Sequence, residues 1–300
     1  MKKILVIGSL NLDTSIKVKA MPKAGETILG MAVSQASGGK GANQAYAAGM
    51  LGGDVSMLGS VGNDREGRTV SGNLKKAGVD TSGIRICEKA ATGQAFVTVD
   101  SSGQNSIIVI PGANNETTAE YLTEHTEYMD EADIIVMQFE IPFDAVNYVK
   151  QYAVHKGKIL IVDPAPARGS IPESFWKGID YLKPNETELE ILSGRRLAGE
   201  QDICDAAGEL IRKGVRNVIV SLGDKGCIRV HNDGVNYFEA EKVNAVDTTA
   251  AGDSFTGAFA VALSEGKTTE EAVSFAQKAA SITVTRKGAQ ASIPSRDQVK

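Results

Sequence analysis

The sequence has few cysteines and none of the patterns that mark disulfide frameworks, zinc sites or membrane spans. Cys87, Cys204 and Cys227 are widely spaced and form no C-x-x-C pair, which favours a reducing compartment, the cytoplasm. No segment approaches the roughly 20 consecutive apolar residues of a membrane helix. The apolar stretch at residues 4–8 is short, is followed by polar residues and lacks a cleavage site, so it predicts a buried first strand and not a signal peptide.

A surplus of basic residues is lacking as well. Lys and Arg number 32 against 37 Asp and Glu, which gives a net charge of -5. We therefore expect neither nucleic acid nor a membrane as a partner, and expect a small-molecule ligand. The chain has no internal repeat, low-complexity tract or linker, and its 300 residues, 42% of them hydrophobic, predict one domain over residues 1–300.

What the sequence does contain is an alternation of strand and helix patterns. Short β-branched runs occur at Ile4–Gly8, Asp133–Met137, Ile159–Asp163 and Asn217–Gly223. Helical patterns occur at Ala42–Leu51, Phe143–His155 and Ile203–Lys213. This order is typical of β-α-β units, and the runs are apolar throughout because both faces of such a sheet are buried. The sequence therefore predicts an α/β fold with a central, mostly parallel sheet.

A second pattern, in which apolar and polar residues alternate, predicts a small antiparallel sheet with one wet face. It occupies Thr14–Lys19, Glu26–Gln35, Gly93–Asp100 and Asn105–Ile110. Strands inserted at about 14–36 and 92–110 would form a sheet that stands off the main domain. We interpret it as a lid over a pocket, and a surface flap or an oligomer contact is the alternative.

Polar, glycine-rich segments mark where chemistry is expected, because ligands of open parallel sheets bind beyond the carboxyl ends of the strands. Asn11 and Asp13 follow the first predicted strand and offer an amide and a carboxylate to hydroxyl groups, unless they only form an Asx turn. In Ser37–Ala45, glycines allow close approach of a ligand, and Lys40 and Asn43 add donors before a helix begins.

The glycine-rich segment does not match the nucleotide-binding fingerprints. A Walker motif needs Ser or Thr after the Gly-Lys pair, and here Gly41 follows Lys40. No G-x-G-x-x-G follows a strand either. A nicotinamide-dependent oxidoreductase, which would fit the predicted sheet, therefore lacks its main support.

The run DTTAAGDSF, Asp247–Phe255, precedes a long apolar helix that we expect to begin near Asp253. The small residues Ala250, Ala251 and Gly252 would present backbone N–H groups as an anion hole for a moving phosphoryl group. Asp253 would take the proton of the attacking hydroxyl, as the catalytic base. A plain helix cap is an equally good reading of Asp253 from its sequence alone.

Together these segments resemble the signatures of the ribokinase family of carbohydrate and nucleoside kinases, over essentially the whole chain. The motifs that carry the resemblance are SGGKGANQA, DTTAAGDSF, DPAPA at 163–167, KPNETE at 183–188 and TRKGAQ at 285–290. The resemblance implies a three-layer α/β sandwich with a β-lid, often joined to a second lid in a homodimer. It also implies transfer of phosphate from Mg-ATP to the 5-hydroxyl of D-ribose, with deoxyribose, fructose or a nucleoside as alternative acceptors. A catalytically silent sugar-binding protein on the same fold is an alternative of another class.

The resemblance also implies roles for individual residues. For the sugar it implies Asn11, Asp13, Gly39, Lys40, Gly41, Asn43, Glu140 and Asp253. For ATP and Mg²⁺ it implies Asn185, Glu188, Ser221, Leu222, Gly223, Asp224, Lys225, Gly226, Gly252 and Gln277. For a K⁺ ion it implies Asp247, Thr249, Thr283, Arg286, Gly288 and Ser292.

Some of these residues have plainer readings. Glu140 would otherwise be an ordinary loop carboxylate, Asn185 and Glu188 a helix-capping pair, and residues 221–226 a turn at the end of a strand. The chain also departs from many family members at Ala250, where they carry glycine.

Overall fold

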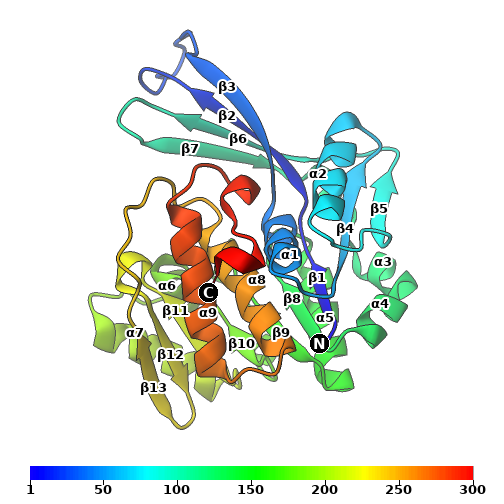
Figure 1. The fold of residues 1–300 in the computed structure, drawn as a ribbon, viewed down its shortest axis with the longest axis vertical. Coiled ribbons are helices and arrows are strands. Elements are labelled where there is room, and N and C mark those ends of the chain that lie inside the picture. Colours follow the sequence, from blue (N-terminus) through cyan, green and yellow to red (C-terminus); the bar gives the residue numbers. More distant parts are fainter. Residues whose placement is uncertain (300) are drawn as a thin grey trace.

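The computed structural model of the protein describes residues 1–299 and is built on a nine-stranded sheet (Figure 1). The strand order is β13-β12-β11-β10-β9-β8-β1-β4-β5. Neighbouring strands from β11 to β5 run parallel, whereas β12 pairs antiparallel with both β11 and β13. The strands are β1 Ile4–Ile7, β4 Val55–Gly62, β5 Ile84–Cys87, β8 Ile134–Met137, β9 Ile159–Val162, β10 Tyr181–Leu182, β11 Asn217–Ser221, β12 Cys227–His231 and β13 Gly234–Phe238.

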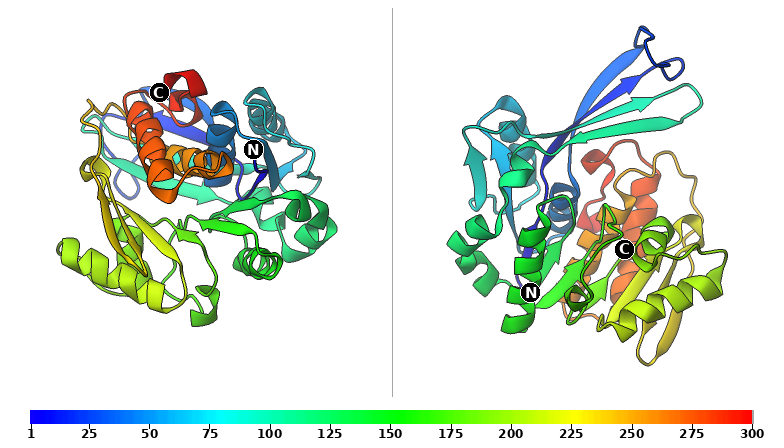
Figure 2. Two further views of the ribbon diagram at one scale, coloured as in Figure 1. Left: turned by 60° about the horizontal axis from the view of Figure 1, so that its bottom comes forward. Right: turned by 180° about the vertical axis from the view of Figure 1, so that it is seen from behind.

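Helices cover both faces of this sheet, as the two other views also show (Figure 2). One face carries α1 Lys40–Met50, α2 Arg65–Lys76, α8 Ala251–Ser264 and α9 Thr269–Val284. The other carries α3 Ala119–Glu124, α4 Thr126–Glu131, α5 Phe143–Lys156, α6 Glu186–Ser193 and α7 Glu200–Arg212. The predicted three-layer sandwich is confirmed.

Strand β1 shows why the sheet strands are apolar throughout. Ile4 and Val6 belong to the core beneath α1, α2, α8 and α9, whereas Leu5 and Ile7 belong to the core on the opposite face. Successive side chains of a strand point to opposite faces, so a strand between two helical layers needs apolar residues at every position. None of the helices within residues 1–299 is long and apolar enough to cross a bilayer.

A second, four-stranded sheet of order β3-β2-β6-β7 projects from the main body (Figures 1 and 2). Its strands are β2 Asn11–Lys17, β3 Ala32–Gly38, β6 Gly93–Val99 and β7 Asn105–Ile110. We call this sheet the lid. It matches the four predicted segments, but its pairing is mixed: β2 and β6 run parallel, while the outer pairs are antiparallel. β2 continues from β1 and β6 follows β5, so both leave the main sheet in the same direction.

The expected bounds of two lid strands were wrong. β2 begins at Asn11 and not at Thr14, because its pairing with β6 extends back to Gly93. β3 begins at Ala32 and not at Glu26. Glu26 instead closes a turn, in which its backbone N–H donates to the carbonyl of Lys23 and its carboxylate accepts from the N–H of Lys23.

Candidate active site

Asp253 lies in the first turn of α8 and is buried, with 6% of its surface exposed. Its Oδ1 accepts a hydrogen bond of 3.0 Å from Gln44 Nε2, and its Oδ2 accepts one of 2.9 Å from Asn43 Nδ2. The N-cap of α8 is Ala250, and no side chain caps the helix. The capping role considered for Asp253 is therefore not the one it has: its carboxylate is turned toward α1.

Glycines let the start of α1 lie against the end of β1. Gly39, the N-cap of α1, has a φ of 86°, and a Cβ there would lie 2.9 Å from the carbonyl oxygen of Ser9. A Cβ on Gly41 would lie 2.6 Å from the backbone nitrogen of Ser9. These glycines therefore permit a close approach of the chain's own backbone, which carries Lys40 and Asn43 to the carboxyl end of β1. The expected close approach of a ligand to this segment stays a prediction.

Glu140, which follows β8, is joined to the same helix start. Its Oε2 accepts hydrogen bonds from Ser9 Oγ at 2.5 Å and from the backbone N–H of Lys40 at 2.9 Å. Burial raises the pKa of Glu140, although the ammonium group of Lys40 acts against this shift. Glu140 is thus part of the same polar cluster as Lys40 and not an isolated loop carboxylate.

Asn11 and Asp13, which were expected to follow the first strand, are the first and third residues of lid strand β2. Asn11 Oδ1 accepts a hydrogen bond of 2.7 Å from Asn114 Nδ2. Asp13 Oδ1 is buried without a hydrogen-bond partner. Burial, followed by the negative charges of Glu140 and Asp253, raises the pKa of Asp13 to about 7. An acceptor that lacks a donor suits a hydroxyl group of a ligand.

Lys40 lies among the carboxylates of the site. Burial would lower its pKa, but the carboxylates of Asp253, Asp163, Glu140 and Glu188 together outweigh burial and raise it. Lys40 therefore stays cationic and offsets part of the negative charge that these side chains place in one region.

The residues expected near ATP and magnesium begin at α6. Asn185 caps this helix: its Oδ1 accepts from the N–H of Glu188 at 2.8 Å, and Glu188 Oε2 accepts from the N–H of Asn185 at 2.8 Å. The plainer reading as a capping pair is thus present in the structure. Burial and the negative charge of Asp163 raise the pKa of Glu188. A β-bridge from Asn185 to Ser221 brings α6 beside the segment 221–226.

The segment 221–226 is a tight turn closed by the N–H of Leu222, which donates to the carbonyl of Gly226 at 2.8 Å. Gly226 has a φ of 98°, and a Cβ there would lie 1.9 Å from the carbonyl oxygen of Phe238. The same carbonyl accepts a hydrogen bond of 3.2 Å from Gln277 Nε2 on α9. Gln277 therefore lies beside this turn. Within the turn, Gly223–Lys225 form a short 3-10 helix.

The residues considered for a monovalent cation surround the loop before α8. Asp247 Oδ1 accepts from the N–H of Thr249 at 3.0 Å, and Oδ2 accepts from the N–H of Gly288 at 2.9 Å. Burial acts to raise the pKa of Asp247, but these N–H groups outweigh it and lower the pKa. The carboxylate is therefore ionised at neutral pH and supplies the negative charge that a cation needs.

The hydroxyl groups in this set are already engaged. Thr283 Oγ1 donates to Ser254 Oγ at 2.8 Å, and Ser292 Oγ donates to the carbonyl of Ala289 at 2.7 Å. Arg286 donates from Nη1 to Gln298 Oε1 at 3.1 Å. A hard monovalent cation takes oxygen ligands, and the hydroxyl oxygens of Thr283 and Ser292 keep lone pairs for it while they donate their hydrogens elsewhere. Arg286 has no side-chain acceptor and could offer only its backbone carbonyl. Residues 1–299 contain no cluster of three or more His, Cys, Asp or Glu that could hold a metal.

Several buried polar residues join this site although no role was predicted for them from the sequence: Gln44, Asp163 and Lys183 lie inside the motifs, and Gln138 lies outside them. Gln44 Nε2 also donates to Asp163 Oδ2 at 2.8 Å, and Gln138 Nε2 donates to Gln44 Oε1 at 2.7 Å. Lys183 Nζ lies 3.8 Å from Asp163 Oδ2 and donates to the carbonyl of Gly252 at 3.3 Å. Polar residues inside otherwise apolar stretches were the available signal, since buried polar groups need partners.

A mostly parallel sheet covered by helices on both faces, with polar side chains gathered at the carboxyl ends of its strands, places the molecule among α/β proteins that bind small ligands at this edge. The family model described as pfkB family carbohydrate kinase matches residues 1–296, and the chain belongs to this family.

Individual relatives agree with this assignment. A ribokinase of Haemophilus influenzae is 39% identical over 297 residues, which covers 99% of this chain and 97% of the relative. A deoxyribokinase of Salmonella typhi is 37% identical over 295 residues, which covers 98% of this chain and 96% of the relative. The structure of Arabidopsis thaliana ribokinase complexed with ribose and ATP has a TM-score of 0.93 at 36% identity. The match covers 99% of this chain and 97% of that chain. A Thermotoga maritima ribokinase structure has a TM-score of 0.91 at 44% identity, and the match covers 100% of this chain and 98% of that chain.

Proposed function

We propose that this protein transfers the γ-phosphoryl group of ATP to the 5-hydroxyl of D-ribose, giving D-ribose 5-phosphate for ribose catabolism. The observation that carries the proposal is the buried carboxylate of Asp253, which meets α1 where Lys40 and Asn43 lie. Full-length relatives named ribokinase, one of them with ribose and ATP bound, support the choice of acceptor and donor.

In this proposal the sugar lies between the lid and the start of α1. Its hydroxyls donate hydrogen bonds to the carboxylates of Asp13 and Glu140 and accept them from Lys40 and the backbone N–H groups at Gly39 and Gly41. The side-chain amides of Asn11 and Asn43 complete the set. Asp253 accepts the proton of the attacking hydroxyl, and two amide donors hold its carboxylate in place. Backbone N–H groups at 250–252 stabilise the charge on the moving phosphoryl group.

The nucleotide is proposed to lie along the turn at 221–226, with Asn185 and Glu188 toward its phosphates and Gln277 toward the adenine side. The adjacency of these segments supports this placement. Mg²⁺, when bound, would neutralise phosphate charge. A K⁺ ion is proposed at Asp247, Thr249, Thr283, Arg286, Gly288 and Ser292, where the ionised Asp247 supports it. Because the donor is a nucleoside triphosphate, we place the protein in the cytoplasm.

We further propose a homodimer that forms through the lids. The lid exposes large apolar side chains, among them Val33, which is 69% exposed, and Ile108, which is 66% exposed. Exposed apolar patches of this kind are typical of interaction surfaces.

The test is a panel of acceptors with Mg-ATP, run with and without K⁺. Ribose should give the highest kcat/KM, and 2-deoxyribose should be slower because a site that bonds a hydroxyl leaves its own polar groups unpaired without it. Equal or faster turnover of 2-deoxyribose, fructose or a nucleoside would reassign the acceptor. ATP binding with no acceptor-dependent turnover would identify a silent sugar-binding protein.

A further inference from the structure

Two chains of side-chain amides end on the two oxygens of Asp253. The first begins on α2, where Asn73 Nδ2 donates to Gln290 Oε1 at 2.5 Å. Gln290 Nε2 donates to Asn43 Oδ1 at 3.2 Å, and Asn43 Nδ2 donates to Asp253 Oδ2 at 2.9 Å. This chain therefore connects α2, the C-terminal segment, α1 and α8 in that order.

The second chain approaches from the other side of α1. Gln138, which follows β8, donates from Nε2 to Gln44 Oε1 at 2.7 Å. Gln44 Nε2 then donates to Asp253 Oδ1 at 3.0 Å and to Asp163 Oδ2 at 2.8 Å. Each oxygen of Asp253 is thus the end of a separate chain.

Both chains point the same way, with every N–H group directed toward Asp253. A primary amide has its acceptor on one arm and its donors on the other, so a donor bound to the oxygen decides where the nitrogen points. An ionised carboxylate only accepts hydrogen bonds, and a flipped amide would place oxygen against oxygen. Gln290 and Gln138 therefore fix the orientation of Asn43 and Gln44, although neither of them touches Asp253.

Because these amides are buried, a change in their orientation would leave hydrogen-bonding groups without partners. Gln138 and Gln44 are fully buried, and Gln290 is 3% exposed, so water cannot replace a lost partner. Gln138 Oε1 has no hydrogen-bond partner, and a Cβ on Gly8 would lie 2.0 Å from it. The orientation of Gln138 thus leaves its own oxygen unsatisfied while its nitrogen serves Gln44. That is expected of a group selected for its effect on a site.

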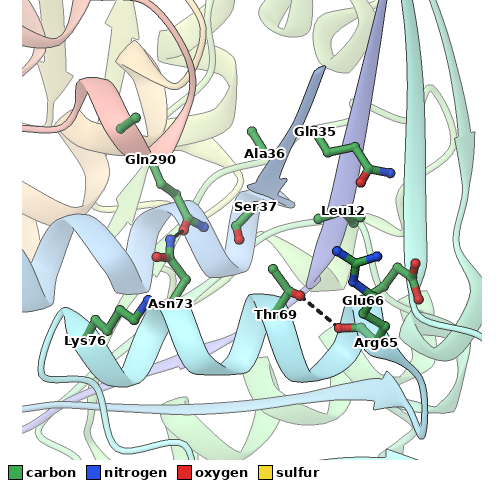
Figure 3. Close-up of a pocket in the computed structure, with 11 residues that line it drawn as sticks. Leu12, Gln35, Ala36, Ser37, Arg65, Glu66, Thr69, Asn73, Lys76 and Gln290 are labelled. Carbon is green, nitrogen blue, oxygen red and sulfur yellow. Dashed lines mark hydrogen bonds between the residues drawn. The ribbon is translucent and has the colours of Figure 1, made fainter. Parts of the chain in front are cut away.

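The first chain has an accessible outer end. Asn73 and Gln290 line a pocket of about 370 Å³ between α2 and the base of the lid, and the ends of their side chains meet at its edge (Figure 3). The inner members of the chain, Asn43 and Asp253, are 6% exposed. Gln290 therefore lies between this pocket and the buried carboxylate.

We infer that Gln290 and Gln138 are positioning residues for phosphoryl transfer, which act by holding Asn43 and Gln44 with their N–H groups toward Asp253. The inference rests on the proposed function, because it assumes that Asp253 accepts the proton of the acceptor. Its chemistry is orientation alone, since neither residue contacts Asp253 in this structure.

Substitution of the outer amides tests this role. Gln290→Met and Gln138→Met keep the side-chain length but remove the donor, and each should lower kcat about five- to twentyfold through misorientation of the base. KM for ATP should stay within about twofold, because the nucleotide segments are untouched. Gln290→Glu should be slower than Gln290→Met, since an acceptor facing Asn43 Oδ1 favours the flipped amide. Gln151→Met and Gln151→Glu, at an exposed position of α5, are the matched controls and should match the wild type.

Two measurements separate positioning from a structural role. Gln138→Met removes one unsatisfied buried oxygen, its own Oε1, and leaves another, Gln44 Oε1, without a donor, so we expect a melting temperature close to that of the wild type although the variant is slow. In an Asn43→Ala background, Gln290→Met should cause no further loss of kcat, because its effect passes through Asn43. Unchanged kcat in the single variants, or an equal loss in the Asn43→Ala background, would overturn the inference. A wild type without sugar-dependent turnover would overturn the proposed function itself.

Discussion

At Asp13, burial and ligand binding make opposite demands on one carboxyl group. Burial and the neighbouring carboxylates raise its pKa to about 7, and its Oδ1 has no partner. Ionisation of Asp13 therefore costs stability in the free protein, whereas an ionised Asp13 is the better acceptor for a sugar hydroxyl. If Asp13 binds the sugar as proposed, this residue favours ligand binding at a cost to the stability of the free protein.

This conflict predicts a pH dependence of stability. The folded-state pKa of about 7 lies above the ordinary value of 3.8, so between these values the folded protein holds a proton that the unfolded chain has released. The free energy of unfolding then falls as pH rises through this range. Asp13→Asn lacks this loss, and should melt higher than the wild type at pH 8 and by a smaller margin at pH 5. Melting curves of both proteins without ligand test this, and parallel pH profiles would contradict it.

Asp253→Asn addresses the proposed base directly. The amide keeps the size of the carboxylate but cannot accept the hydroxyl proton, so we expect kcat to fall by about 10² to 10⁴. ATP binding, measured by calorimetry, should be retained because the nucleotide segments lie elsewhere. Near-normal turnover in this variant would show that another group accepts the proton.

Among the secondary-structure elements, the crossing of α1 and α8 is what brings Asn43 and Gln44 to Asp253. A Cβ on Gly257 of α8 would lie 2.7 Å from both Ala47 Cβ and the carbonyl oxygen of Gln44. The two helices can therefore be this close only because position 257 has no side chain. The active-site geometry depends on a glycine one turn along the helix from Asp253.

Gly257→Ala should consequently impair both stability and turnover. Forcing the helices apart is expected to cost about 1–3 kcal/mol, as overpacking usually does. It should also lower kcat, because the amides move away from Asp253. Gly208→Ala on α7 is the matched control: its new methyl group meets only the end of Arg212, and helix propensity should raise stability by about 0.5–1 kcal/mol. Chemical denaturation and steady-state kinetics of both variants measure these effects.

The sequence predicted elements better than their partners. Strands such as β1, β8 and β9 were found to within a residue because burial on both faces demands continuous apolar runs. The parallel pairing of β2 with β6 was missed, since period-two patterns define a strand but not its neighbour. The motifs located Asp253, Lys40 and Asn43, whereas Gln138 and Asn73 lie outside them and join the site only through tertiary contacts.

At the scale of the whole molecule, the lid is the part least covered by the rest of the chain. By its register, the face opposite Asp13 carries Ile16 beside Val33, and Phe96 beside Ile108. Two lids packed through this face would bury apolar side chains that one chain leaves exposed. The proposed homodimer would therefore stabilise the lid as well as join two sites.

Ile108→Lys should convert the proposed dimer to a monomer, because the proposed interface cannot bury an unpaired ammonium group. Light scattering coupled to size exclusion measures this directly. Ile86→Lys is the matched control, since Ile86 is 63% exposed on β5 of the main sheet. A wild-type monomer, or a dimer that persists in Ile108→Lys, would contradict assembly through this face.

The direct passage of β1 into β2 has an evolutionary consequence. Asn11 and Asp13 belong to the strand that leaves the main sheet and becomes the lid. In the proposed function, acceptor recognition and the cover over the site are therefore encoded by one continuous stretch of chain. A descendant that lost the lid would lose both acceptor selectivity and the cover that excludes water from the site. One that kept the first residues of β2 and changed the rest of the strand could alter its oligomeric state without changing its substrate.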